Sequence, residues 1–250
     1  AMMAAVCASG TSQIVNVARE PEITDLANCL NAMGARITGQ GTDTLTIEGV
    51  TSLSSATHQV VADRVEAGTF IMVAAMSGGS LTVRDIIPHH LDALFDVIRQ
   101  TGVGFDVGDN FVTVTADGRY KAQNVETQAY PGFPTDLQAQ FTAMMCLANG
   151  VSQISETIFE NRFMHVPELV RMGADISVDG RTAVIRGKEA LLAAPVMATD
   201  LRASVSLVLA GLATAGTTRL SHIYHLDRGY AELEAKLGAC GARLRRIHKS

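Results

Sequence analysis

The sequence predicts an α/β fold in which apolar helices are enclosed by small sheets and one helix-strand-helix-strand-strand unit recurs along the chain. Two separate sets of glycines return about every 70 residues, which is the signature of an internal repeat. Apolar runs of helical length lie before the glycines of one set, and pairs of alternating segments follow most glycines of the other. These three observations together indicate repeated units with internal pseudo-symmetry.

The first half of each unit is an apolar helical run that ends at a glycine and precedes a short strand. The runs are predicted at 1–10, 69–79, 137–150 and 201–216. A glycine at the end of such a run indicates the left-handed backbone conformation that often follows a helix. Because these runs have little polar face, we expect their helices to be buried on nearly all sides.

The second half of each unit is a helix that ends at another glycine. After three of these glycines, two alternating segments flank a polar turn, a pattern typical of a β-hairpin. The clearest hairpins join 36–38 to 44–47 and 175–178 to 182–185. The glycines that mark the ends of these helices are Gly34, Gly102, Gly173 and Gly241.

The repeat is incomplete at both ends of the sequence. The first unit begins at Ala1 inside an apolar run with no capping residue before it. The last unit stops after Ile247, before a second hairpin strand. Because an unpaired strand edge needs a partner, we expect a segment N-terminal to Ala1 to supply both missing pieces.

Composition and charge argue against several classes of function. The chain is 47% hydrophobic and 18% charged, which is typical of a globular protein with a core. The net charge is −5, and the basic cluster at 243–246 is better explained as a solvated strand edge than as a nucleic-acid patch. The apolar stretch 205–215 is too short to span a bilayer. We therefore expect neither nucleic acid nor a membrane as partner.

The cysteines do not indicate a metal site. Cys7, Cys29, Cys146 and Cys240 lie at no metal-ligand spacing, and no signal peptide precedes them. We interpret all four as free core thiols of a protein in a reducing cytoplasm.

Polar residues at the predicted helix starts depart from the repeat. Thr135-Asp136 and Thr199-Asp200 precede two apolar helices, and Asp63-Arg64-Val65-Glu66 occupies the matching place one unit earlier. Threonine and aspartate are good N-caps, worth about 1 kcal/mol, so capping is the simplest interpretation of each pair taken alone.

Arginines near the same helix starts need a second explanation, because they oppose the helix dipole. The arginines are Arg19, Arg162, Arg202 and Arg228. Each can form an ion pair with a local acid, or all can serve a dianionic ligand that binds guanidinium groups and helix N-termini. If several units bring their helix starts together, their charges surround one anion.

Four segments resemble the enolpyruvyl transferases, and within them the branch that starts peptidoglycan synthesis. They are Pro131-Gly132-Phe133-Pro134-Thr135-Asp136-Leu137-Gln138-Ala139-Gln140, Glu156-Thr157-Ile158-Phe159-Glu160-Asn161-Arg162-Phe163-Met164-His165-Val166, Ala198-Thr199-Asp200-Leu201-Arg202-Ala203-Ser204 and Tyr224-His225-Leu226-Asp227-Arg228-Gly229-Tyr230. The resemblance covers the whole chain and includes 19–22 and 63–70. These segments do not resemble the motifs of the sister branch that acts on shikimate phosphate.

The resemblance implies two inside-out α/β barrels, the enolpyruvyl transferase fold, with this chain incomplete at the N-terminus. Residues 1–61 would be the last repeat of the first domain. Residues 62–250 would be the second domain, lacking its N-terminal strand. The implied reaction transfers the enolpyruvyl group of phosphoenolpyruvate to the 3′-hydroxyl of UDP-N-acetylglucosamine through a tetrahedral ketal and releases phosphate. No metal or redox cofactor is implied.

The resemblance also assigns roles to single residues. Asp136 would accept the proton of the sugar hydroxyl, and Arg228 would be catalytic with it. Arg202 and Arg228 would hold phosphoenolpyruvate and stabilise the developing charge, with Arg162 beside them. The expected substrate-binding set is Asp136, Ile158, Phe159, Arg162, Arg202 and Arg228. The residues expected to support them from outside are Glu20, Glu22, Arg64, Glu66 and Asp200.

The family's phosphoenolpyruvate lysine, its general-acid cysteine and most uridine contacts would lie N-terminal to Ala1. We therefore expect the 250-residue chain to be inactive unless the missing N-terminal part of the same protein complements it. Three alternatives remain open at this point. One is a non-catalytic truncated product or ligand-binding paralogue of the same fold, another is 3-phosphoshikimate 1-carboxyvinyltransferase, and the third is a ring-forming repeat scaffold such as a DNA clamp.

Overall fold

The computed structural model describes residues 1–247, which fall into two compact units. Unit 1 contains Ala1–Ala62 and Ala129–Gly132, and unit 2 contains Asp63–Gln128 and the chain from Phe133 onward. Within residues 1–247 no helix combines the length and the apolar composition that a membrane span requires.

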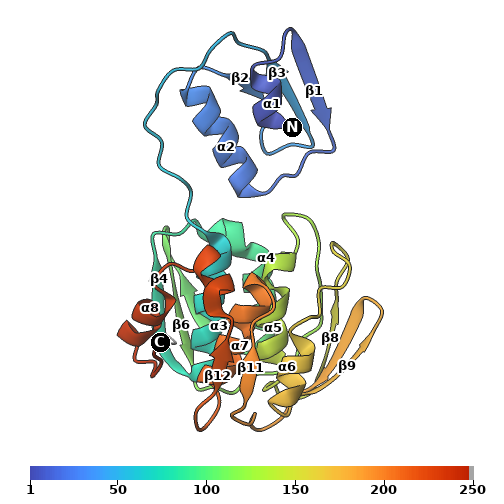
Figure 1. The fold of residues 1–250 in the computed structure, drawn as a ribbon, viewed down its shortest axis with the longest axis vertical. Helices are drawn as coiled ribbons and strands as arrows, with labels where there is room; N and C mark the ends of the chain where they lie inside the picture. Colours follow the sequence, from blue (N-terminus) through green and yellow to red (C-terminus); the bar gives the residue numbers. More distant parts are fainter. Residues whose placement is uncertain (248–250) are drawn as a thin grey trace. The chain divides into compact units, whose positions relative to one another are not determined.

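Unit 1 is one copy of the predicted helix-strand-helix-strand-strand unit (Figure 1). Its strands form an antiparallel sheet in the order β1-β3-β2. Val6, Leu45 and Ile47 are fully buried at the centre of its core. Its elements are α1 (Met2–Val6), β1 (Thr11–Val15), α2 (Pro21–Ala32), β2 (Arg36–Thr38) and β3 (Thr44–Glu48).

Unit 2 repeats the same order of elements. Its helices are α3 (Arg64–Ser77), η1 (Pro88–Leu91), α4 (Asp92–Thr101), η2 (Thr135–Leu137), α5 (Gln138–Met145), α6 (Val166–Arg171), α7 (Leu201–Leu212), η3 (Ile223–Arg228) and α8 (Leu233–Ala239). Its strands are β4 (Gly79–Arg84), β5 (Gly104–Val107), β6 (Phe111–Ala116), β7 (Val125–Glu126), β8 (Val151–Ser155), β9 (Asp175–Asp179), β10 (Thr182–Arg186), β11 (Pro195–Met197) and β12 (Arg219–Ser221).

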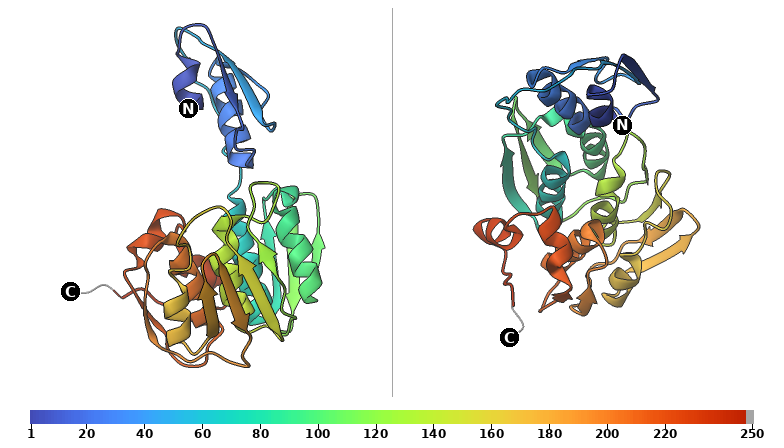
Figure 2. Two further views of the ribbon diagram at one scale, coloured as in Figure 1. Left: turned by 90° about the vertical axis from the view of Figure 1, so that its right-hand side faces the viewer. Right: turned by 45° about the horizontal axis from the view of Figure 1, so that its top comes forward.

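The strands of unit 2 form small separate sheets in the orders β4-β6-β5, β7-β8-β10-β9 and β11-β12. The hairpins β5–β6 and β9–β10 are antiparallel, whereas β7 joins β8 and β11 joins β12 in parallel. Figures 1 and 2 show α3, α5 and α7 in the middle of this unit, with β4 and β6 on one side and β8 and β9 on the other. The three helices contact one another, and every residue of α5 is buried. The prediction of buried helices inside a shell of sheets is confirmed for unit 2, whereas in unit 1 the run at 1–10 forms only the short helix α1, in which Met3 and Ala4 are exposed.

The glycine markers adopt the predicted backbone conformation. All eight have a φ between 84° and 122°. At Gly34, Gly173 and Gly241 the glycine N–H bonds the carbonyl three residues back, and the next N–H bonds the carbonyl five residues back. This pairing satisfies carbonyls that a helix end leaves free. In the other set, α5 and α7 end at Met145 and Leu212, before Gly150 and Gly216, so these glycines begin the turn into a strand.

Two interpretations of the sequence are wrong. The basic cluster at 243–246 is not a strand edge, because residues 242–247 form no strand and have no hairpin partner within the described chain. Arg246 instead bonds Asp227 at 2.6 and 3.0 Å and forms an ion pair with Glu234. The cysteines are all free, but they are not all core thiols. Cys146 is buried, whereas Cys7 and Cys240 are exposed directly after the last residues of α1 and α8.

Candidate functional site

The candidate site is built at the start of the buried helices of unit 2. Asp63 and Asp200 are N-caps of α3 and α7, and each carboxylate accepts two backbone N–H groups at 2.8–3.1 Å. Asp136 takes the equivalent place before α5 but caps nothing, because the chain enters α5 through the single turn η2. Its carboxylate is therefore available to side chains.

Asp136 lies between two arginines. Its Oδ1 accepts from Arg162 Nη2 at 2.5 Å, and its Oδ2 accepts from Arg202 Nη2 at 3.0 Å. The side chains are 37%, 23% and 18% exposed, so the group lies at the surface without being fully solvated. The three residues come from η2, from the loop before α6 and from the first turn of α7. The predicted convergence of helix starts is observed for these three.

The two guanidinium groups set the protonation state of Asp136. Burial alone raises its pKa, but the charges of Arg202 and Arg162 and their hydrogen bonds outweigh that effect. The net pKa lies below the ordinary aspartate value, so Asp136 is ionised at neutral pH. Burial lowers the pKa of Arg202, and its bonds to Asp136 and Tyr230 raise it above its usual range.

Arg162 also has a second partner and an aromatic neighbour. Its Nη1 donates to Thr135 Oγ1 at 2.7 Å. Its guanidinium lies 4.8 Å from the ring centroid of Phe159, at cation–π distance. Arg162 is thus fixed from three directions, and its planar group faces Asp136.

Glu156 lies behind this group, and reasoning from sequence missed it. Its side chain is 1% exposed directly after β8, and its carboxylate accepts from Thr135 Oγ1 at 2.8 Å. It also accepts from the backbone N–H groups of Ile158 and Phe159, both at 3.0 Å. An acid that directly follows a predicted strand and opens a motif was the available signal.

Ile158 and Phe159 carry the exposed apolar surface of the site. Their exposed fractions are 39% and 53%. Both lie in the loop between β8 and α6 that also carries Arg162. Large apolar side chains exposed beside charged groups are a common feature of binding surfaces.

A buried polar group supports the backbone under Asp136. Gln140 Nε2 donates to the carbonyl of Asp136 at 3.0 Å, to Thr69 Oγ1 at 3.1 Å and to the Tyr230 hydroxyl at 3.3 Å. Tyr230 and Thr69 are each 1% exposed, and their oxygens lie 3.0 Å apart. Burial raises the pKa of Tyr230, and bonds from Thr69, Arg202 and Gln140 partly offset this. Three elements of unit 2 are tied together immediately below the carboxylate.

Arg228 does not join the cluster by direct contact. It ends η3, two residues before Tyr230, and its side chain is exposed. It makes no hydrogen bond or ion pair with the part of the chain that the structure describes. The structure therefore brings together Asp136, Arg162 and Arg202 and leaves Arg228 as an unpaired cation.

The residues expected to support the site have different surroundings. Asp200 caps α7 and accepts the backbone N–H of Arg202, so it fixes the turn that carries this arginine. Glu66 forms an ion pair with Lys236 at 2.7 Å, and Arg64 is the first residue of α3. Glu20 and Glu22 stand at the start of α2 in unit 1. Apart from the cap at Asp200, the supporting role of this set stays a prediction.

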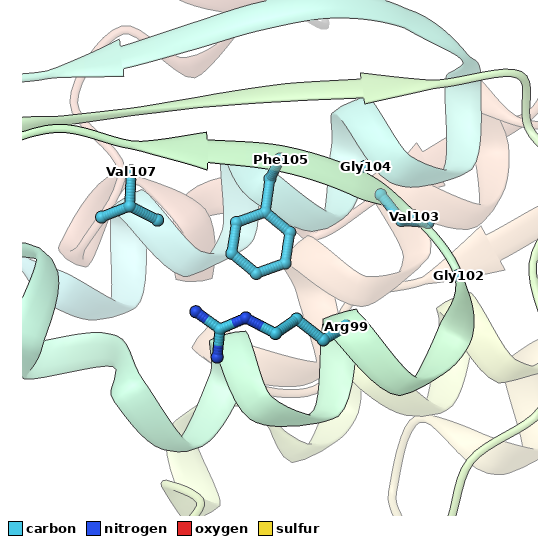
Figure 3. A pocket seen from close by; sticks show the side chains of 6 residues that line it. All are labelled: Arg99, Gly102, Val103, Gly104, Phe105 and Val107. Carbon is cyan, nitrogen blue, oxygen red and sulfur yellow. The ribbon is translucent and has the colours of Figure 1, made fainter.

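A separate cavity lies elsewhere on unit 2. It is an open hollow of about 450 Å³, where Arg99 lies under Phe105 with 5.1 Å between guanidinium and ring (Figure 3). Arg99 is paired with Asp96 at 2.8 Å, so the hollow offers no free charge. Its lining residues are Arg99, Gly102, Val103, Gly104, Phe105 and Val107. Within residues 1–247 no group of three or more His, Cys, Asp or Glu side chains is arranged to hold a metal ion.

The comparison with protein families decides the relationship. Residues 1–237 match the family EPSP synthase (3-phosphoshikimate 1-carboxyvinyltransferase). The chain belongs to this family. The predicted resemblance to enolpyruvyl transferases is confirmed, and the alternative of a ring-forming scaffold is excluded.

Within the family, curated relatives carry the name of the peptidoglycan branch. The UDP-N-acetylglucosamine 1-carboxyvinyltransferase of Rhizobium etli is 56% identical over 247 residues, covering 98% of this chain and 57% of the relative. The enzyme of that name from Geobacter metallireducens is 55% identical over 246 residues, covering 98% of this chain and 59% of the relative. The chain therefore spans less than two thirds of the length of these relatives.

Solved structures show the same fold. The enolpyruvyl transferase NikO from Streptomyces tendae superposes with a TM-score of 0.87 at 30% identity, covering 98% of this chain and 58% of that structure. The EPSP synthase from Acinetobacter baumannii superposes with a TM-score of 0.73 at 17% identity, over 99% of this chain and 60% of that structure, and supports the fold alone. The predicted enolpyruvyl transferase fold is confirmed.

Proposed function

We propose that this chain supplies the phosphoenolpyruvate-binding side of a UDP-N-acetylglucosamine 1-carboxyvinyltransferase, which starts peptidoglycan synthesis. The observation that carries the proposal is Asp136 held between Arg162 and Arg202 at the starts of two buried helices. Two guanidinium groups at one place are suited to a ligand with phosphate and carboxylate groups. The names and identities of the curated relatives support this branch over the shikimate branch.

In the proposed reaction an anion competes with Asp136 for the arginines. Phosphoenolpyruvate takes up the guanidinium groups of Arg162 and Arg202, with Arg228 as the third cation. Asp136 then loses the positive charges that hold its pKa low, so it becomes a better proton acceptor. We propose that it accepts the proton of the sugar 3′-hydroxyl when that oxygen attacks.

The proposed reaction is an addition followed by an elimination. The 3′-oxygen bonds to C2 of phosphoenolpyruvate while C3 gains a proton, which gives a tetrahedral ketal. The C2–oxygen bond to phosphate then breaks and C3 loses a proton, which leaves the enolpyruvyl ether and phosphate. No step changes an oxidation state, so the reaction requires no redox cofactor. The arginines stabilise charge on the departing phosphate.

The proposed nucleotide-sugar contact is restricted by Glu156. Because the N–H groups of Ile158 and Phe159 both donate to this carboxylate, they are not available to a ligand. What remains for the nucleotide sugar is the backbone carbonyls and the exposed apolar side chains. We propose that Ile158 and Phe159 act through these.

We propose that residues 1–61 are the last repeat of a first domain and that 62–250 form a second domain that lacks its N-terminal strand. The division of the chain between Ala62 and Asp63 supports this assignment. The proposed partners are the two small substrates and the N-terminal part of the same protein, and the proposed location is the cytoplasm.

The test uses the full reading frame that contains these 250 residues, expressed alongside the 250-residue chain. Phosphate release is followed with phosphoenolpyruvate and UDP-N-acetylglucosamine. We expect turnover by the protein that the full reading frame encodes, called the full product below, and none by the shorter chain. Release with shikimate 3-phosphate instead would assign the sister reaction. Binding of phosphoenolpyruvate without turnover by the full product would identify a non-catalytic paralogue.

A further inference from the structure

We infer that Thr135 and Glu156 form a positioning pair that sets Arg162 against Asp136 and, through a separate oxygen of Glu156, holds the Ile158–Phe159 segment. The kinetic part of this inference rests on the proposed function. The contacts themselves are a property of unit 2 alone. Neither residue needs to touch a substrate for the pair to act.

Glu156 is buried and fully coordinated. Its side chain is 1% exposed, which is rare for a carboxylate that forms no ion pair with any residue of 1–247. Both of its oxygens are occupied by donors, three on Oε1 and one on Oε2. Such complete coordination fixes the carboxylate plane, so groups bonded to either oxygen are fixed with it.

The hydrogen bonds through Thr135 have a fixed direction. Its hydroxyl accepts from Arg162 Nη1 at 2.7 Å and lies 2.8 Å from Glu156 Oε2, to which it donates. A hydroxyl has a single proton, and Thr135 donates it to the carboxylate of Glu156. The lone pairs of Thr135 are therefore directed at Arg162, which in turn reaches Asp136.

The two carboxylate oxygens of Glu156 bond different segments. Oε1 accepts from Thr127 Oγ1 and from the N–H groups of Ile158 and Phe159, each at 3.0 Å. Oε2 accepts from Thr135 alone. Because the two sets of bonds are separate, one can be removed while the other remains.

Two isosteric substitutions separate the two sets. Thr135→Val removes the acceptor of Arg162 and the donor to Oε2. Thr127→Val removes a donor to Oε1 and also the acceptor that Thr157 N–H uses at 2.9 Å. Thr113→Val is the matched control for Thr135→Val, because it also removes a half-buried hydroxyl, one that bonds Thr82 Oγ1 at 2.9 Å on the β4–β6 pair.

The kinetic test measures kcat and both KM values in the full product. We expect Thr135→Val to lower kcat about tenfold or more, the usual effect of losing a hydrogen bond to a charged group. Thr135→Ser keeps the hydroxyl and should retain most of the original kcat. We expect Thr127→Val to raise the KM for the nucleotide sugar about fivefold with kcat nearly kept. Thr113→Val should change none of the three.

The inference would be overturned if Thr135→Val and Thr127→Val changed the kinetics in the same way, each lowering kcat and raising both KM values in step with a fall in Tm. So would unchanged kinetics in both variants of an active protein. A full product without any turnover would count against the proposed function instead. In that case hydrogen exchange at the backbone amides of the 250-residue chain tests the positioning pair directly. Glu156→Ala should speed exchange at Ile158 and Phe159, and unchanged exchange there would overturn the inference.

Discussion

Replacing Asp136 by Asn should strengthen anion binding while abolishing the proposed proton transfer. In the structure this carboxylate occupies both Arg162 and Arg202, at 2.5 and 3.0 Å. An incoming anion must displace it and is also repelled by its charge. Asparagine keeps the shape, cannot accept a proton at neutral pH and leaves the two cations uncompensated.

The expected gain follows from Coulomb's law. A unit charge about 5 Å from the anion contributes roughly 3 kcal/mol at an effective dielectric constant of about 20. Asp136 is 37% exposed, so solvent reduces this value. We expect about 1–2 kcal/mol, which corresponds to roughly tenfold tighter binding. Because the effect is electrostatic, it should shrink as salt is added.

The assay is calorimetric titration of the 250-residue chain with phosphoenolpyruvate and with inorganic phosphate. Asp175→Asn is the matched control, because Asp175 also lies between two cations, Arg186 at 3.8 Å and Lys188 at 3.6 Å, with a similar exposure of 42%. It removes the same charge away from the site and should leave anion affinity unchanged. Equal or weaker binding by Asp136→Asn would refute the reasoning.

Three further predictions concern unit 2. Tyr230→Phe removes a hydroxyl from a buried polar group and should lower the unfolding free energy by about 1–3 kcal/mol in urea titrations, and an unchanged midpoint would contradict this. Gly187→Ala would place a methyl carbon 1.7 Å from the carbonyl oxygen of Ala148, so we expect a loss of about 2–3 kcal/mol. Gly238→Ala meets open space in α8 and should be neutral or stabilising in the same urea titrations, so equal losses in the two variants would contradict the steric argument. Burial is the main cause that lowers the pKa of His165 to about 4. Because the unfolded chain takes up this proton near its ordinary pKa of 6.5, stability should fall as the pH drops from 6.5 to 4, by the order of 3 kcal/mol. His165→Gln should flatten this dependence in urea titrations at successive pH values, and an equal slope would contradict it.

Much of the fold could be predicted because its signals are local and repeated. A helix end that needs a positive φ selects glycine, and both sets of markers carried that signal at one period. Apolar runs without a polar face indicated helices buried on all sides, as α5 is. Charged residues at helix starts, such as Asp136 and Arg202, indicated a site because capping explains the aspartate, whereas the arginine opposes the helix dipole.

The missed features depend on partners far away in the chain. Glu156 is bonded to Thr127 and Thr135, more than 20 residues before it, and no spacing announces such a pair. The exposure of Cys7 depends on what covers the end of a helix, which composition does not record. The segment 243–246 alternates like a strand, yet a strand forms only where a neighbour pairs with it.

The repeat itself explains how a site arises in such a fold. Asp63, Asp136 and Asp200 hold equivalent places before three buried helices, and two of them cap their helices. Before the third helix, α5, the chain forms the turn η2 instead, and the carboxylate of Asp136 accepts no backbone N–H there. A cap carboxylate is satisfied by its own helix, whereas a released one must find cations. Arg162 and Arg202 meet that need in the free protein, and the same need makes them available to a competing anion.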